Sequence, residues 1–244
     1  MKESSRKKAF FDSLFEFSTN WCKVLNGGQV PNKKLWELSN GNIEALLWNN
    51  KAIPKTGLSF LAREGTYRVG LNIYVRNPII PDGSFAVLLA QQDDISFIGG
   101  VLELFPAVSI EEDISGFRTG LDKIAQKHKM DSGQLRQGLI GAFTVGRERE
   151  NLGAVAGFNL YRAGLEVTAD NLNFAQEAFL KALEEYQAII DKRKHEVMES
   201  IKTKEHTWQK HLNFMKEEDI GIKMALEQGL PMDFFEYSTF PPKQ

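Results

Sequence analysis

The sequence predicts one α/β domain over residues 1–244, built as a three-layer α/β/α sandwich around a central, mainly antiparallel sheet. Between residues 43 and 105, short β-rich runs follow one another with only a turn between them. Parallel strands need crossover connections of about a dozen residues or more, so these strands must be antiparallel. Several runs, such as residues 86–90, are apolar on both faces, and helical patterns precede and follow the series. Such a sheet has to be covered on both sides, which gives three layers.

Hydrophobic period and turn residues place the individual elements. Strands are predicted for residues 43–48, 58–63, 67–76, 85–91, 95–105 and 154–162. Helices are predicted for residues 10–25, 109–129 and 208–226, and for a long stretch that starts after Asp170 or Asn171. Phe179, Leu183 and Tyr186 give that long helix an apolar stripe that should pack on the sheet. The aromatic-rich residues 230–237 should dock on the domain, and residues 130–151 have the composition of a loop or a short helix.

Composition argues against several classes of function. The net charge is −2 with both signs interleaved, so no nucleic-acid partner is expected. The single cysteine, Cys22, excludes an internal disulfide, and its apolar helical surroundings favour a buried, inert thiol. The four histidines make no recognised zinc spacing, so no metal site is expected, and phosphate-binding loops and nucleophile-elbow motifs are missing. No segment reaches the roughly 20 apolar residues of a membrane helix. Without a signal pattern either, we expect no membrane partner and a cytoplasmic location, or the plastid stroma in a eukaryote.

Three stretches of the chain carry a resemblance to a known family. The first is the strand series of residues 43–106, which contains LNIYVRNP, GSFAVLL and GVLELFP. The second is AGFNLYR, residues 156–162, just ahead of the long helix. The third, residues 208–241, combines an aromatic-rich helix, an acidic run that ends in Asp219, then Gly229 and a terminal Phe-Pro. In order and spacing these stretches resemble the ferredoxin-dependent bilin reductases.

The resemblance implies a fold and a reaction. Members of that family bind a linear tetrapyrrole such as biliverdin between the sheet and the C-terminal helices. They take electrons one at a time from ferredoxin, hold no bound cofactor, and use carboxylates to protonate the bilin. For this chain the resemblance therefore implies a linear tetrapyrrole ligand, ferredoxin as external electron donor, and an oxidoreductase that works as a monomer.

The acids depart from the family pattern. Leu88 stands where the resemblance places the first catalytic aspartate, so we expect it to contact the substrate without donating a proton. The histidine that some members carry on the preceding strand is also missing. Asp219 matches the second family acid and is the expected proton donor, although an aspartate at a helix start is equally typical of an N-cap. Glu103, inside an apolar run, is the second catalytic candidate; alternatively its side chain reaches solvent or an arginine.

Other polar side chains are candidates for substrate binding. Asn72, Tyr74 and Arg76 should share one strand face by the period of two, where a ligand could satisfy them; the alternative is an edge strand facing water. Arg147 and Arg149 resemble the arginine that holds a bilin propionate in the family, because the guanidinium fork fits a carboxylate. In a charged loop, both could equally be surface residues. A last candidate lies on the helix of residues 208–226: His211, among aromatic neighbours, could equally be a solvated histidine.

Two classes of function follow from these residues. The first is a reductase, or an isomerase-like converter, of a linear tetrapyrrole, whose regiochemistry differs from that of ordinary relatives because of Leu88. The second is a non-catalytic carrier or sensor of a bilin on the same scaffold. A repurposed fold that acts on another conjugated acid is the remaining alternative.

Overall fold

Seven strands form one sheet in the computed structural model, which describes residues 2–92, 95–105, 111–129, 161–168, 172–196, 201–217 and 219–242. The strands are β1 (Asn32–Leu38), β2 (Gly41–Trp48), β3 (Lys55–Arg63), β4 (Thr66–Tyr74), β5 (Asp82–Gln92), β6 (Ile95–Phe105) and β7 (Tyr161–Thr168). They lie in chain order, and each is antiparallel to its neighbours. The predicted antiparallel series is therefore confirmed.

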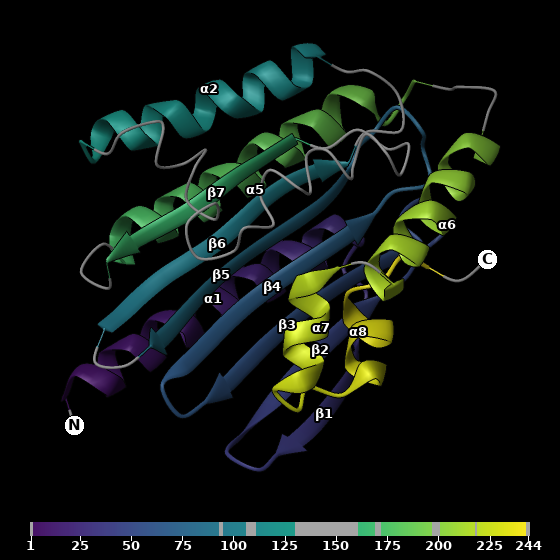
Figure 1. The fold of residues 1–244 in the computed structure, drawn as a ribbon. Coiled ribbons are helices and arrows are strands. Elements are labelled where there is room, and N and C mark those ends of the chain that lie inside the picture. The colour runs from purple at the N-terminus through teal and green to yellow at the C-terminus, as the bar shows by residue number, and fades with distance from the viewer. Residues whose placement is uncertain are drawn as a thin grey trace.

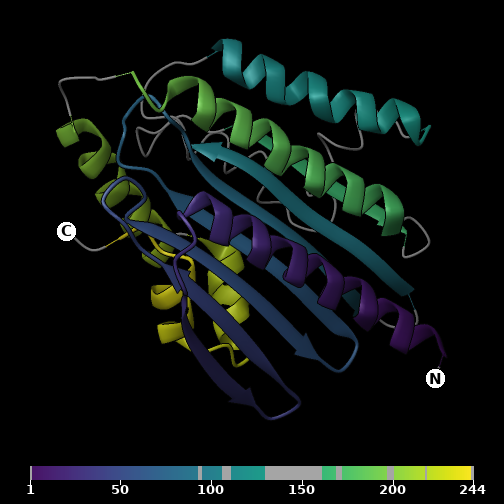
Figure 2. The ribbon, with the colours of Figure 1, turned by 180° about the vertical axis from the view of Figure 1, so that it is seen from behind.

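Helices cover both faces of this sheet, as Figures 1 and 2 show from opposite sides. They are α1 (Lys2–Leu25), α2 (Glu111–Lys127), α5 (Leu172–Arg193), α6 (Ile201–Glu217), α7 (Ile220–Glu227) and α8 (Met232–Ser238). On the back face, α1 and α5 lie against the sheet and α2 packs beside α5. On the front face lie α6, α7 and α8. The three-layer α/β/α sandwich predicted from the sequence is what the described residues form.

The back layer supplies the larger core. Phe179, Leu183 and Tyr186 of α5 are fully buried there, as the apolar stripe predicted. The Tyr186 hydroxyl donates a hydrogen bond to the backbone oxygen of Pro81, 2.8 Å away, so its polar end is satisfied inside the core. Cys22 is buried in the same cluster, and burial raises the pKa of its thiol, as expected of an inert cysteine.

The C-terminal segment is held on the front face by its backbone carbonyls. Lys55 Nζ donates to the oxygen of Glu236 at 2.7 Å, and the Tyr74 hydroxyl donates to that of Thr239 at 2.6 Å. Gly57 of β3 lies directly under this segment, and a Cβ there would overlap the Ser238 backbone. The docking predicted for the aromatic-rich C-terminal residues is confirmed, and the absence of a side chain at Gly57 permits the close approach.

A buried ion pair fixes α6 to the start of β5. Lys204 Nζ lies 3.1 Å from Asp82 Oδ1, and both side chains are almost fully buried. Trp208 Nε1 donates to the other oxygen of Asp82 at 2.6 Å, and the Val75 backbone N–H donates to Oδ1 at 2.9 Å. Together these bonds fix the orientation of the helix that carries His211, Phe214 and Met215 over the sheet.

Besides shifts at the ends of several helices and strands, three elements differ from the prediction. The strand β1 was not predicted, and the predicted helix 208–226 is two helices, α6 and α7, with Asp219 at the start of the second. The predicted strand 154–162 overlaps β7 only at its end; residues 154–160 and 130–151 lie outside the described residues.

Among the residues that the structure describes, no helix combines the length and the apolar character needed to cross a membrane.

Candidate functional site

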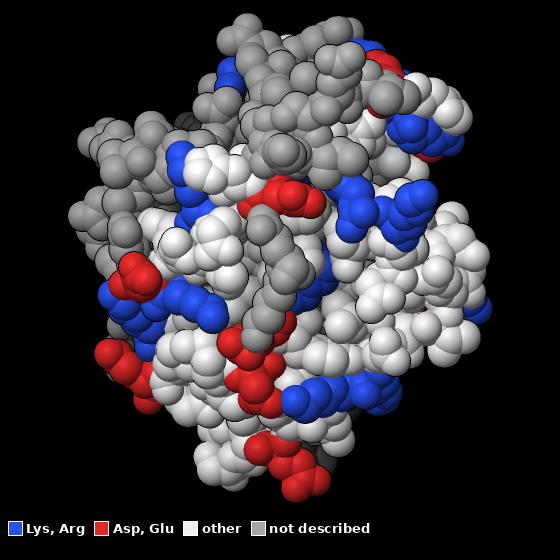
Figure 3. Space-filling model, turned by 90° about the vertical axis from the view of Figure 1, so that its right-hand side faces the viewer, with Lys and Arg blue, Asp and Glu red and all other residues white. Residues whose placement is uncertain are grey.

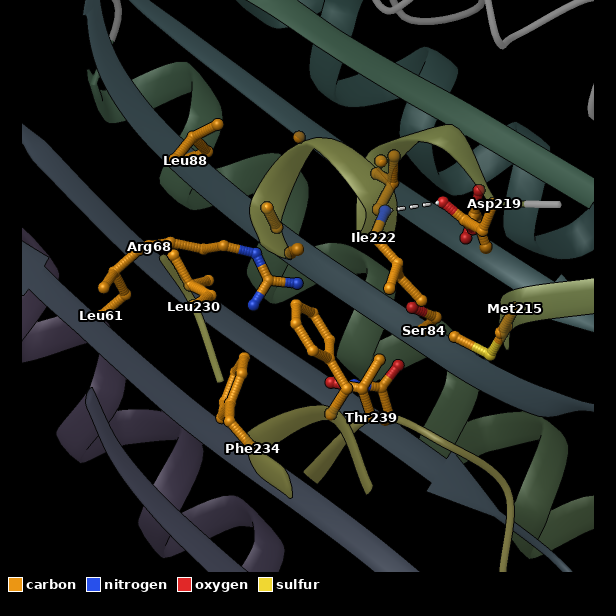
Figure 4. Close-up of a pocket in the computed structure, with 18 of the residues that line it drawn as sticks. Leu61, Arg68, Ser84, Leu88, Met215, Asp219, Ile222, Leu230, Phe234 and Thr239 are labelled. Atoms are coloured by element: carbon orange, nitrogen blue, oxygen red, sulfur yellow. Dashed lines mark hydrogen bonds between the residues drawn. The ribbon is translucent and has the colours of Figure 1, made fainter. Parts of the chain in front are cut away.

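A cavity of about 250 Å³ lies between the front face of the sheet and helices α6, α7 and α8. Its walls are mainly apolar, with a few polar groups among them, which is the usual make-up of a small-molecule site. Figure 4 shows side chains from the strands and from the C-terminal helices converging on it. The resemblance places the ligand in this same layer, between sheet and C-terminal helices.

The strand register arranges the sheet wall of the cavity in three rows. Asn72, Ser84 and Glu103 are aligned across β4, β5 and β6, and this row is polar. Two residues further along β5 the wall is small and apolar, at Ala86. The third row lies two residues beyond Ala86 along β5 and consists of Arg68, Leu88 and Gly99. At about 3.3 Å per residue, the first and third rows are roughly 13 Å apart along the strand.

Two carboxylic acids line the cavity from opposite walls. Glu103 projects from β6 and is 3% exposed, so the apolar run around it does bury this side chain. Asp219, at the start of α7, is 1% exposed. Its Oδ1 accepts a hydrogen bond from the Ile222 backbone N–H at 3.0 Å, the dashed line in Figure 4. Asp219 is therefore both an N-cap and a cavity residue, and the two expectations for it do not exclude each other.

A cation enters the cavity from its other end. Arg68 of β4 reaches into the cavity on the same side as Leu88, away from Asp219 and Met215 (Figure 4). Its Nη1 is 3.4 Å from Ser59 Oγ. Desolvation lowers the pKa of Arg68 to about 10, which leaves the guanidinium charged at neutral pH.

Aromatic rings close the cavity beside the polar row. The His211 ring lies 4.6 Å from the Phe105 ring, centroid to centroid, and is 6% exposed. Tyr74 lies just outside the cavity, with its ring 6.3 Å from that of Trp208. Burial, followed by the charges of Asp82 and Glu103, raises the pKa of Tyr74, so it stays a neutral hydrogen-bond donor.

The structure brings together most, but not all, of the predicted site residues. Asn72, Leu88, Glu103, His211 and Asp219 all line the cavity. Asn72 and Glu103 are buried rather than facing water, and so is His211.

Two sets of predicted residues are not part of the cavity. Tyr74 holds the C-terminal segment rather than lining the cavity. Arg76 was expected on the face of Asn72, but β4 ends at Tyr74, and Arg76 is exposed beside a groove formed by α1 and α5. That expectation is wrong because the strand period does not continue past the strand end. Arg147 and Arg149 lie outside the described residues.

Sequence reasoning missed Arg68. The period of two that selects Asn72 and Tyr74 also selects Arg68 and Gly70 in the other direction along β4. The period therefore places Arg68 on the cavity face, but an arginine near a strand start is more often a surface residue.

Charge on the molecular surface is mixed. On the face drawn in Figure 3, Lys and Arg side chains alternate with Asp and Glu side chains among the described residues. Within the described part of the chain, no three His, Cys, Asp or Glu side chains are grouped as metal ligands.

Neither a scan against models of known protein families nor a search of curated proteins found a match to this chain.

Proposed function

We propose that this protein reduces a linear tetrapyrrole such as biliverdin with electrons from ferredoxin, in the cavity between the sheet and the C-terminal helices. The observation that carries the proposal is the pair of buried carboxylic acids, Glu103 and Asp219, on opposite walls of one mainly apolar cavity. A flat conjugated molecule fits between a sheet and a helical layer, and its ring edges would face these acids.

The chemistry needs only protons from the protein. Reduction of one double bond takes two electrons, delivered singly by two reduced ferredoxins, and two protons. Asp219 supplies the first proton and Glu103 is positioned for the second; both acids regain theirs from solvent. Proton donation by a placed side chain typically contributes about 10²–10⁴-fold to a rate.

The acids also set the regiochemistry. Leu88, at the position where the resemblance expects an acid, lies in the Arg68 row at the far end of the cavity from Glu103. The protonated atom of the ligand is therefore at the Glu103–Asp219 end, roughly 13 Å along the strand from the position that family members use. Its product should differ from theirs for that reason.

The size of the cavity limits how a tetrapyrrole fits. Its volume of about 250 Å³ is below the range of roughly 300–1,000 Å³ common for drug-sized ligands. Part of the tetrapyrrole therefore extends out of the cavity, or α7 and α8 move apart on binding. We place the reaction in the cytoplasm, or in the plastid stroma in a eukaryote.

Leu88 also favours a second candidate function. With an apolar residue at the family's first acid, the same cavity could hold a bilin or another conjugated acid without reducing it. The protein would then be a carrier or sensor.

Absorption spectroscopy distinguishes the candidates. Biliverdin is added to the purified protein, and a ferredoxin reducing system follows under anaerobic conditions. We expect a shifted spectrum on binding and a new band on reduction. A shifted spectrum that stays fixed on reduction supports the carrier, and no shift at all excludes both tetrapyrrole functions.

Two conservative variants test the proton donors. Asp219→Asn keeps the N-cap and removes the titrating group, so binding should persist while turnover falls by about 10²–10⁴-fold. Glu103→Gln should reduce turnover as well. The control is Asp12→Asn on the exposed surface of α1, which should leave the rate unchanged. Wild-type rates in both cavity variants would show that neither acid is the donor.

A further inference from the structure

Arg68 occupies a place in the cavity that is unusual for a cation. Its neighbours across the sheet are Leu61 on β3 and Leu88 on β5, and all three side chains line the cavity. The guanidinium lies over Gly70, and a Cβ at that position would overlap it. Gly70 thus allows the side chain to lie along its own strand, with its charged end directed into the cavity (Figure 4).

The charge of Arg68 is not balanced by the described residues around it. Among the described side chains its one polar contact is the hydroxyl of Ser59, at a long 3.4 Å. A guanidinium carries five N–H donors, so most of its hydrogen-bonding capacity faces the cavity. Arg68 is half-buried, and a partly desolvated charge without a partner is costly. An anion in the cavity would offset part of that cost.

We infer that Arg68 binds a carboxylate of the ligand and so fixes which end of the ligand reaches the acids. The inference rests on the proposed function for the cavity and specifies its substrate: a conjugated molecule with an acidic side chain. The planar guanidinium fork can give such a carboxylate two parallel hydrogen bonds. The acidic group lies by the guanidinium over Gly70, and the atom to be protonated lies at the Glu103 end.

The row spacing sets the distance between the carboxylate-binding group and the proton donor. The Arg68 guanidinium lies over Gly70, in the row of Ala86, and Glu103 belongs to the next row, roughly 7 Å away along the strand. A substrate that contacts both groups therefore carries its carboxylate about that far from the atom to be protonated. A propionate side chain on a linear tetrapyrrole meets this requirement.

The test compares an acid with its ester in wild-type protein and in Arg68→Gln. Equilibrium binding of biliverdin and of biliverdin dimethyl ester is measured by absorption. We expect wild-type protein to bind the acid about 10- to 100-fold more tightly than the ester, the factor that a charge-assisted hydrogen bond supplies. Arg68→Gln should bring the ratio close to one by weakening the acid, and Arg68→Lys should give an intermediate ratio.

Two further variants complete the test. Arg63→Gln makes the same change at the end of β3, where the side chain donates to Gln228 outside the cavity, and it should keep the wild-type ratio. Leu88→Asp places a carboxylate beside Arg68, because the two residues are cross-strand partners, and it should abolish the preference by neutralising the cation. Thermal unfolding of each variant confirms that the fold is intact.

A second ligand pair separates this inference from the proposed function. Pyrenebutyric acid and its methyl ester, measured by fluorescence, carry the same chemical difference on an unrelated aromatic body. If biliverdin fails to bind but the pyrene acid shows a preference that depends on Arg68, the tetrapyrrole is wrong and the carboxylate site stands. If biliverdin binds with equal affinity in wild type and Arg68→Gln, the site is wrong and the tetrapyrrole stands. The absence of an Arg68-dependent preference in both pairs overturns the inference.

Discussion

A hydrogen-bonded carboxylate at the start of α8 should make one part of the fold sensitive to acid. Lys34 Nζ lies 2.6 Å from Asp233, and the Trp36 indole N–H donates to the same carboxylate at 3.0 Å. The Lys34 hydrogen bond first, and then the Trp36 bond, lower the pKa of Asp233. A carboxylate whose folded-state pKa is lowered adds stability above its unfolded value of about 3.9, and loses it as pH falls through the folded value.

The expected outcome is a pH-dependent difference between wild type and Asp233→Asn. Both partners are largely exposed, so the difference in unfolding free energy at pH 6 should be small, at most about 1 kcal/mol. It should shrink as pH is lowered below about 4, as measured by urea unfolding with Trp36 fluorescence among the signals. A difference that stays constant down to pH 2 would show that the Asp233 carboxylate adds no stability through its charge.

The sequence predicts the site residues only where the period of two along a strand, or the apolar character of the neighbours, determines where a side chain lies. Asn72 and Leu88 are on the cavity wall because alternation places them there, and Glu103 is buried because its neighbours are apolar. The prediction for Arg76 was wrong because the period of two does not indicate where β4 ends. Arg68 was missed for the complementary reason: a lone arginine near a strand start is usually a surface residue, and only its position over Gly70 reveals its direction.

At the scale of elements, the ion pair between α6 and β5 should hold α6 in place over the cavity. Lys204→Met would leave Asp82 buried without its cation, which typically costs about 3–5 kcal/mol. Adding Asp82→Asn should recover part of that loss, because no unpaired charge remains. Urea unfolding of both variants measures the effect, and biliverdin affinity should fall with it, because α6 carries His211 to the cavity.

A surface lysine provides the matched control for this prediction. Lys181 pairs with Glu184 and Glu185 on α5, where Lys181→Met should cost about 0–1 kcal/mol. Equal losses in Lys181→Met and Lys204→Met would mean that the buried pair does not hold α6.

Elements with a strong apolar stripe were predictable, and elements without one were not. The α5 stripe and the central strands follow from burial on both faces of the sheet. By contrast β1 is an edge strand in which Trp36 is the one buried residue, so burial does not alternate along it. The division between α6 and α7 depends on the Asp219 cap, a local hydrogen bond that interrupts a continuous helical pattern.

At the scale of the whole molecule, the sequence predicts that a front helical layer exists, but not where that layer lies on the sheet. The aromatic residues near the C-terminus indicated that this segment docks. Its contacts with Asn72 and Tyr74 join residues more than 160 positions apart, and only the folded chain brings them together. The cavity lies between those helices and the sheet, where the small side chain of Ala86 forms part of the wall.

The central claim is that this cavity is the ligand site, and filling it is the most direct test. Ala86 lies in the middle row of the sheet wall, so Ala86→Trp should occupy the space without replacing Glu103, Asp219 or Arg68. Ala225→Trp fills the cavity from α7, and Ala188→Trp on the exposed side of α5 is the control. The measurement is an absorption titration with biliverdin in variants that keep a cooperative unfolding transition. We predict a shifted spectrum in wild type and Ala188→Trp and none in the two cavity variants; an undiminished shift in both cavity variants would contradict the account.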